Sequence, residues 1–164
     1  MNRDKFLALL REALSTIKEP RLFKTERGYQ GELLAALRSR LQGANFSGDP
    51  IVEQEYQKRV LPHGIRIRPD LLIHIPFERG VTEGRAEGNF VAIELKRDPR
   101  EVPDAFENLR KLKERLNYPI TILVMVDSAD TWASECPETI ADQTVCFAVR
   151  LENGELRILM ERCA

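Results

Sequence analysis

Three charged residues, Asp70, Glu94 and Lys96, interrupt two segments whose apolar residues alternate as in β-strands, 65–75 and 89–96. Side chains on a strand point alternately to opposite faces, so Glu94 and Lys96 share one face. A half-buried carboxylate costs several kcal/mol unless it is paired with a cation or bound to a metal ion. Two neighbouring strands that each carry such an acid, the second followed by a lysine, therefore indicate a shared chemical purpose.

A divalent cation would satisfy this pattern. Mg²⁺ prefers oxygen ligands and is usually held by one or two carboxylates together with substrate phosphate. Asp70 and Glu94 are the candidate carboxylate ligands, and the backbone carbonyl of Leu95 is a candidate third ligand. Lys96 could orient or deprotonate an attacking water and stabilise negative charge on the phosphate. The combination favours metal-dependent hydrolysis of phosphodiester bonds.

In this context, Pro69-Asp70 followed by Glu94-Leu95-Lys96 resembles the signature of the PD-(D/E)XK nuclease superfamily. The resemblance covers roughly residues 25–126. It implies a restriction-endonuclease-like core and Mg²⁺-dependent cleavage of DNA or, less often, RNA, with Mn²⁺ as a substitute metal. It also implies that Asp70 and Glu94 bind the metal ion and that Lys96 is catalytic. The roles implied are repair, recombination, restriction or phage defence.

Many members of this superfamily add a glutamate from the first core helix, and Glu26 and Glu32 compete for that role. The helix predicted over 26–41 has an apolar stripe that includes Leu33 and Leu37. At about 100° per residue, Glu26 falls inside this stripe and Glu32 falls outside it. A ligand must face the sheet, as the stripe does, so we prefer Glu26. A purely local role for Glu26, in a first turn where the helix dipole favours acids, is the competing interpretation.

Simpler interpretations of the strand residues also remain open. Asp70 could be neutralised by Arg66 or Arg68, which share its face of the strand. Glu94 and Lys96 could form a solvated pair on an open face of a sheet, where such charges are common. Neither interpretation explains why the acids and the lysine occur together, and this is why the metal-site hypothesis is preferred.

The elements that must position these residues are predicted from two hydrophobic periods. Apolar residues every three or four positions predict helices, and alternation or a short apolar run predicts strands. The predicted order is helix 3–18, helix 26–41, strands 51–59, 65–75 and 89–96, helix 103–117, strand 120–126, and a hairpin over 144–161 that turns at Asn153-Gly154. This order predicts one α/β domain, 1–164, with a central mixed β-sheet flanked by helices.

Composition bounds the partners and the compartment. The net charge of the 164-residue chain is −1, so nucleic-acid binding would need a local basic surface rather than a basic chain. The basic residues of helix 103–117 are better explained as a solvated face: Arg110, Lys111, Lys113 and Arg115. Three cysteines without a metal-binding spacing, no long apolar run and no signal-peptide pattern predict a cytoplasmic protein that does not enter a membrane.

Two classes of function follow from the sequence. The first is a metal-dependent nuclease whose partner is nucleic acid, with DNA preferred over RNA. The second is a non-catalytic protein of nuclease fold that binds nucleic acid or a partner protein, and whose binding would survive chelation of metal ions. A homodimer would suit the first class, because small nucleases that cut both strands often pair by two-fold symmetry.

Overall fold

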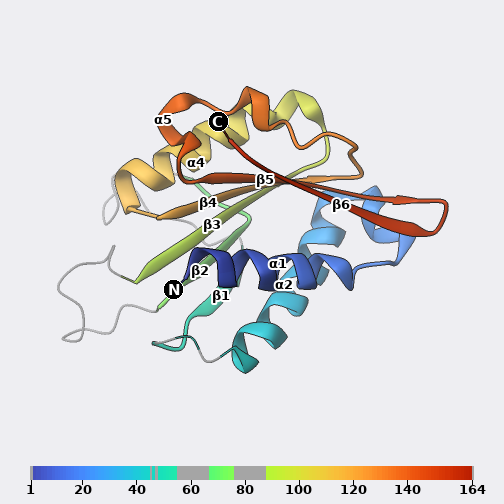
Figure 1. Ribbon diagram of the computed structural model, residues 1–164, viewed down its shortest axis with the longest axis horizontal. Helices are drawn as coiled ribbons and strands as arrows, with labels where there is room; N and C mark the ends of the chain where they lie inside the picture. The colour runs from blue at the N-terminus through green and yellow to red at the C-terminus, as the bar shows by residue number, and fades with distance from the viewer. Residues whose placement is uncertain (1, 45, 47, 55–66, 76–87, 164) are drawn as a thin grey trace.

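The computed structural model describes residues 2–44, 46, 48–54, 67–75 and 88–163. Within these ranges a six-stranded sheet has the order β1-β2-β3-β4-β5-β6 (Figure 1). The strands are β1 (Ile51–Gln54), β2 (Leu71–His74), β3 (Asn89–Lys96), β4 (Ile120–Val126), β5 (Thr144–Glu152) and β6 (Glu155–Arg162). The sheet is mixed, because β3, β4 and β5 run parallel whereas the pairs β1–β2, β2–β3 and β5–β6 are antiparallel.

Helices cover both faces of this sheet (Figure 1). On one face lie α1 (Arg3–Ser15) and α2 (Glu26–Gly43), and on the other lie α4 (Val102–Leu116) and the short α5 (Glu138–Ala141). The described residues also form three 3₁₀ segments: η1 (Pro20–Lys24) between α1 and α2, η2 (Pro99–Glu101) before α4, and η3 (Ala133–Glu135) before α5. The predicted α/β class, with a mixed central sheet flanked by helices, is confirmed for the described residues. Every described helix is too short or too polar to span a bilayer.

Local chemistry sets the helix ends. The side chains of Asn2 and Thr25 accept hydrogen bonds from backbone N–H groups in the first turns of α1 and α2. Pro103 lies in the first turn of α4, where its missing N–H costs nothing. Asn117 ends α4 with a φ of 52°, the left-handed conformation that commonly terminates helices. The predicted helix starts at 26 and near 103 therefore have a direct physical basis.

Alternation along the strands divides the core into two halves. On β3, Ile93 packs with α1 and α2, whereas Ala92 packs beneath α4. All of β4 is buried, as predicted for a strand covered on both faces. Glu94 and Lys96 have the parity of Ala92 but lie at the end of β3, where Glu26 in the first turn of α2 contacts Lys96.

The C-terminal hairpin turns where its sequence predicts. Asn153 and Gly154 have φ values of 51° and 82°. Two consecutive positive φ angles are required by the type I′ turn, which Asn-Gly adopts most readily. The register pairs Glu152 with Glu155 and continues to Val145 with Arg162, so β6 reaches one residue beyond the predicted end at 161.

Several predicted boundaries are wrong. β2 begins at Leu71, so Asp70 lies in a bend immediately before the strand rather than inside it. Pro69 has no N–H to give to a strand ladder, which explains the late start. The N-terminal helix predicted over 3–18 ends at Ser15, and Pro20 instead begins η1. Of the strand predicted over 51–59, β1 occupies the first four residues and 55–59 lie outside the described residues.

Candidate active site

The antiparallel pairing of β2 and β3 brings Asp70 and Glu94 to the same edge of the sheet. Asp70 immediately precedes Leu71, which pairs with Ile93, so the start of β2 lies beside the end of β3. The backbone N–H of Leu95 donates a 2.7 Å hydrogen bond to Oδ2 of Asp70. The Asp70 carboxylate is therefore fixed against β3 although the residue lies outside the strand.

Lys96 lies among three carboxylates from distant parts of the chain. Its Nζ is 3.4 Å from Oε1 of Glu26, 3.7 Å from Oδ2 of Asp70 and 3.6 Å from Oε2 of Glu94. It also donates a 2.8 Å hydrogen bond to the carbonyl oxygen of Leu95. The structure thus brings together all the residues predicted for the site. We call these residues, Glu26, Asp70, Glu94, Leu95 and Lys96, the Lys96 cluster.

The first turns of α2 supply one member of the cluster and one support. Glu26 is the first residue of the helix, directly after the N-cap Thr25. Gln30, one turn later, is only 2% exposed and donates a 2.9 Å hydrogen bond to the backbone carbonyl of Asp70. Glu32 is exposed on the same helix and is not among the carboxylates that contact Lys96. Glu26, which the helical wheel placed on the face towards the sheet, is therefore the helix glutamate that lies at the cluster.

Burial sets the electrostatics of the cluster. The side chain of Glu94 is only 3% exposed, and its Oε1 has no hydrogen-bond partner among the described residues. Burial, reinforced by the neighbouring charge of Asp70, holds the pKa of Glu94 well above its ordinary value. Burial also raises the pKa of Glu26. Burial alone would lower the pKa of Lys96, but the three carboxylates outweigh it and raise that pKa.

The oxygen donors of the Lys96 cluster fit a hard divalent cation by their chemistry. Carboxylate and carbonyl oxygens are the ligands that Mg²⁺ prefers, and the unpartnered Oε1 of Glu94 is a buried acceptor without a donor. As the side chains stand, no group of three acidic, histidine or cysteine residues in the described ranges is arranged to hold a metal ion. The Lys96 ammonium lies among the carboxylates, so cation binding would require it to move aside.

A cavity of about 380 Å³ opens beside Glu26. It is lined by Glu26, Arg97, Asp98, Pro99, Glu101 and Asp127. Arg97 donates 3.0 Å and 3.1 Å hydrogen bonds to the carbonyl of Phe23 and to Oδ2 of Asp127, which joins the ends of β3 and β4 to η1. The described lining is therefore mostly acidic, with Arg97 as its one cation.

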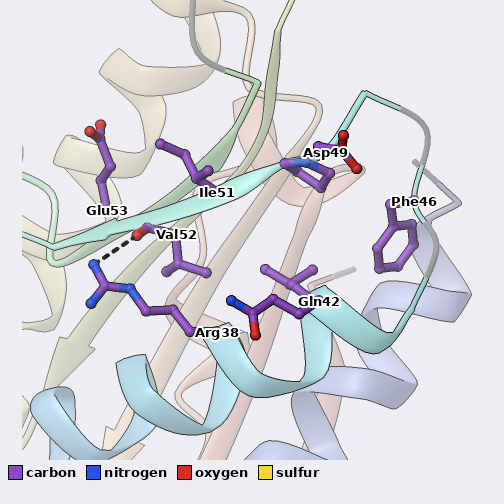
Figure 2. Close-up of a pocket in the computed structure, with 9 residues that line it drawn as sticks. Arg38, Gln42, Phe46, Asp49, Ile51, Val52 and Glu53 are labelled. Atoms are coloured by element: carbon purple, nitrogen blue, oxygen red, sulfur yellow. Dashed lines mark hydrogen bonds between the residues drawn. The ribbon is translucent and has the colours of Figure 1, made fainter.

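A larger groove of about 580 Å³ lies elsewhere, between the end of α2 and β1 (Figure 2). Figure 2 shows Arg38 on α2 donating to the backbone carbonyl of Val52 across this groove, at 3.3 Å. None of the Lys96 cluster lines it. We therefore take the Lys96 cluster as the candidate site, because buried opposite charges from distant segments converge there and not at the larger groove.

Other residues singled out from the sequence have different placements. His74 is paired with Glu53, with 2.8 Å between Nε2 and Oε2, and so belongs to the β1–β2 ladder. Arg68 is exposed, and Arg66 and His63 lie outside the described residues.

Sequence reasoning gave no role to the hydrogen bond of Gln30 or to the pairing of Arg97 with Asp127. A polar residue within an apolar helix stripe, as Gln30 is, indicates a buried hydrogen bond. Arg97 follows β3 and Asp127 follows β4, and residues that follow neighbouring parallel strands meet at one edge of a sheet.

Comparison of the chain with protein-family models, curated proteins and solved structures gives no match in any of the three. The Lys96 cluster and the motif that supplies its residues are therefore the features from which a function is inferred.

Proposed function

We propose that the protein is a divalent-metal-dependent nuclease of the PD-(D/E)XK type, which hydrolyses phosphodiester bonds of DNA. One observation carries the proposal. Three carboxylates from separate elements, one of them almost completely buried, lie within 3.7 Å of a single lysine nitrogen. A structural ion pair needs one acid for one lysine, and each further carboxylate that is removed from water without a partner is costly. A site that receives an additional cation explains why three acids surround one lysine.

In this proposal Asp70, Glu94 and the carbonyl of Leu95 hold Mg²⁺, or Mn²⁺ in its place, and Glu26 completes the set directly or through water. The cation would supply Lewis-acid polarisation of a phosphoryl oxygen. The ammonium of Lys96 has three donor hydrogens, with which it can orient an attacking water and stabilise negative charge on the phosphate. Gln30 holds the backbone at Asp70 and so acts as a positioning residue.

The cavity beside Glu26 is consistent with a cation-dependent substrate site. Its acidic lining would repel a phosphodiester unless a bound cation offset the repulsion. Arg97 is positioned by Phe23 and Asp127 at the same edge and is the candidate contact for a phosphate oxygen. Because the cysteines and the chain's composition favour a reducing compartment, we place this activity in the cytoplasm.

The first test is titration of the full chain with Mn²⁺ by calorimetry, because metal binding does not require the right nucleic acid. Wild-type protein should bind, and Asp70→Ala should bind much more weakly. Glu114→Gln, a change on the exposed face of α4, is the matched control and should bind like the wild type.

Cleavage is then measured on supercoiled plasmid, linear duplex and single-stranded RNA with Mn²⁺, with and without EDTA. Cleavage that EDTA and Lys96→Met both abolish supports the proposal. Absence of both Mn²⁺ binding and cleavage would overturn it. Nucleic-acid binding that survives EDTA, without cleavage, would instead identify a non-catalytic protein of this fold.

A further inference from the structure

β6 is an edge strand that is able to pair with a further strand. It is the terminal strand of the described sheet, and its eight residues include neither proline nor glycine. Leu159 and Met160, which are adjacent in β6, are 49% and 41% exposed, and Ile51 is the only other large hydrophobic residue so exposed in the described ranges. Half of the residues of β6 are charged, and an exposed edge strand whose backbone groups stay unpaired tends to pair with another strand.

The open hydrogen-bonding groups of β6 belong to alternate residues. The N–H of Cys163 donates to the carbonyl of Thr144, so Cys163 faces β5. Orientation alternates along an antiparallel pair, so Leu159 also faces β5, whereas Ile158 and Met160 direct their N–H and C=O groups outward. No hydrogen bond from any described residue satisfies these outward groups.

A second copy of β6, running antiparallel, can satisfy them. A ladder forms only in registers that place outward residues opposite outward residues. One such register sets Leu159 opposite Leu159 on a two-fold axis and Ile158 opposite Met160 of the second copy. The exposed apolar side chains of both copies then cover one another on the two faces of the joined sheet.

Charge complementarity selects this register. With Leu159 on the axis, Arg157 of each copy stands opposite Glu161 of the other, and opposite charges in such positions stabilise a sheet. A shift one way places Glu155 opposite Glu161, two like charges. A shift the other way places the apolar Leu159 opposite Glu161. Of the three neighbouring registers, only the central one places Arg157 and Glu161, the charged residues two positions from the axis, opposite each other.

We propose that the protein forms a two-fold symmetric homodimer through antiparallel pairing of β6 with β6, which continues the sheet across both copies. The inference does not depend on the proposed nuclease function. It has a consequence for that function, because strand direction reverses across the axis. The ends of β3 in the two copies then lie at opposite edges of the joined sheet, so each Lys96 cluster is complete within its own copy.

The oligomeric state of the full chain tests the proposal by sedimentation velocity over a range of concentrations. Wild-type protein should sediment as a dimer, and Leu159→Lys should weaken dimerisation at least about tenfold. Ile51→Lys is the matched control, because it changes an exposed hydrophobic residue on the opposite edge strand, and it should leave the dimer intact. A wild-type monomer at every concentration, or equal effects of the two variants, would overturn the proposal.

A charge swap tests the register. R157E and E161R should each weaken self-association, because each places like charges opposite one another at both ends of the interface. An equimolar mixture of the two variants should form a heterodimer, and the double variant R157E/E161R should regain the homodimer. Circular dichroism confirms that each variant folds. Failure of the mixture to associate would overturn the register.

Contacts within the chain cannot produce this rescue. Arg157 pairs with Glu152 at 3.0 Å and Glu161 contacts Thr131 in the same copy. R157E loses the first contact and E161R loses the second. Mixing the two variants restores neither contact, because both lie within one copy.

Discussion

Two clusters of carboxylates around a cation, one at Lys96 and one at Arg110, use the same groups in opposite settings. Arg110 lies on the solvated face of α4 and contacts Glu107 and Glu114, which are three and four residues away. Lys96 contacts carboxylates from α2, from the bend before β2 and from β3, and Glu26 is 70 residues away in the sequence. The first cluster forms within one helix, whereas the second exists only in the folded chain.

The electrostatic consequences differ in sign. Hydrogen bonds from Arg110 lower the pKa of Glu107 to about 2, because water on the open face leaves little cost of burial. Burial raises the pKa of Glu94 despite the nearby ammonium. The Arg110 cluster therefore stabilises the ionised form of Glu107, whereas burial in the Lys96 cluster disfavours the ionised form of Glu94. Such perturbed groups gathered beside a cavity are the usual mark of a functional site.

The largest difference between the clusters should be in activity. Asp70→Ala and Lys96→Met should each reduce metal-dependent cleavage at least about 10²-fold, because they remove a metal ligand and a group that stabilises charge in the transition state. Arg110→Met should leave the rate unchanged. Initial rates of plasmid cleavage at saturating Mn²⁺ measure the effect. Equal losses in all three variants would indicate a general effect on folding and would remove the distinction.

The next largest difference should be in stability without metal. The raised pKa of Glu94 means that the native state favours its protonated form, so its ionisation destabilises the fold. The stability that protonated Glu94 contributes is complete below about pH 4.5, its ordinary pKa. It is lost as the pH rises through the higher pKa of the native state. Glu94→Gln should therefore raise the free energy of unfolding at neutral pH.

Urea unfolding in EDTA, at neutral pH and below pH 4.5, measures this difference, and the gain should disappear at the lower pH. Glu114→Gln serves as the isosteric control. A loss of stability in Glu94→Gln at neutral pH would identify Glu94 as a structural partner of Lys96. Both clusters would then be stabilising groups of ion pairs.

A smaller effect distinguishes the two helix glutamates. Glu26→Gln should weaken Mn²⁺ binding about tenfold, which corresponds to about 1.4 kcal/mol, because Glu26 lies at the cluster. Glu32→Gln should leave binding unchanged, since Glu32 is exposed outside it. Calorimetric titration of both variants decides between them. The opposite order would transfer the role to Glu32.

The order of elements and the convergence of the site follow from short-range patterns in the sequence. Asn153-Gly154 fixes its own turn, and the parity of Glu94 and Lys96 on β3 is a property of a single strand. The neighbouring position of Asp70 follows once the two strands pair antiparallel. These features needed only local geometry and one correct pairing.

The remaining features depend on contacts that local patterns do not contain. The start of β2 after Asp70 reflects Pro69 and the hydrogen bond from Leu95, which joins residues 25 apart. The support from Gln30 spans 40 residues. The short α5 has only four residues, too few for a helical period to be recognised. Each of these features is decided by packing rather than by propensity.

The smallest expected effect concerns Glu107 and its dependence on salt. The lowered pKa of Glu107 favours its ionised form in the native state, so its contribution is present above about pH 4.5 and is lost as the pH falls through about 2. Glu107→Gln should therefore lower stability at neutral pH. The effect is opposite in sign to that of Glu94→Gln and smaller, since exposed ion pairs contribute little.

Salt separates the two effects. At 1 M salt the Debye length falls to about 3 Å, which should remove the effect of Glu107→Gln, whereas the effect at the buried Glu94 should largely remain. Urea unfolding of both variants at low and high salt measures this contrast, and an effect of Glu107→Gln that persisted in high salt would contradict the assignment of the Arg110 cluster to a solvated surface.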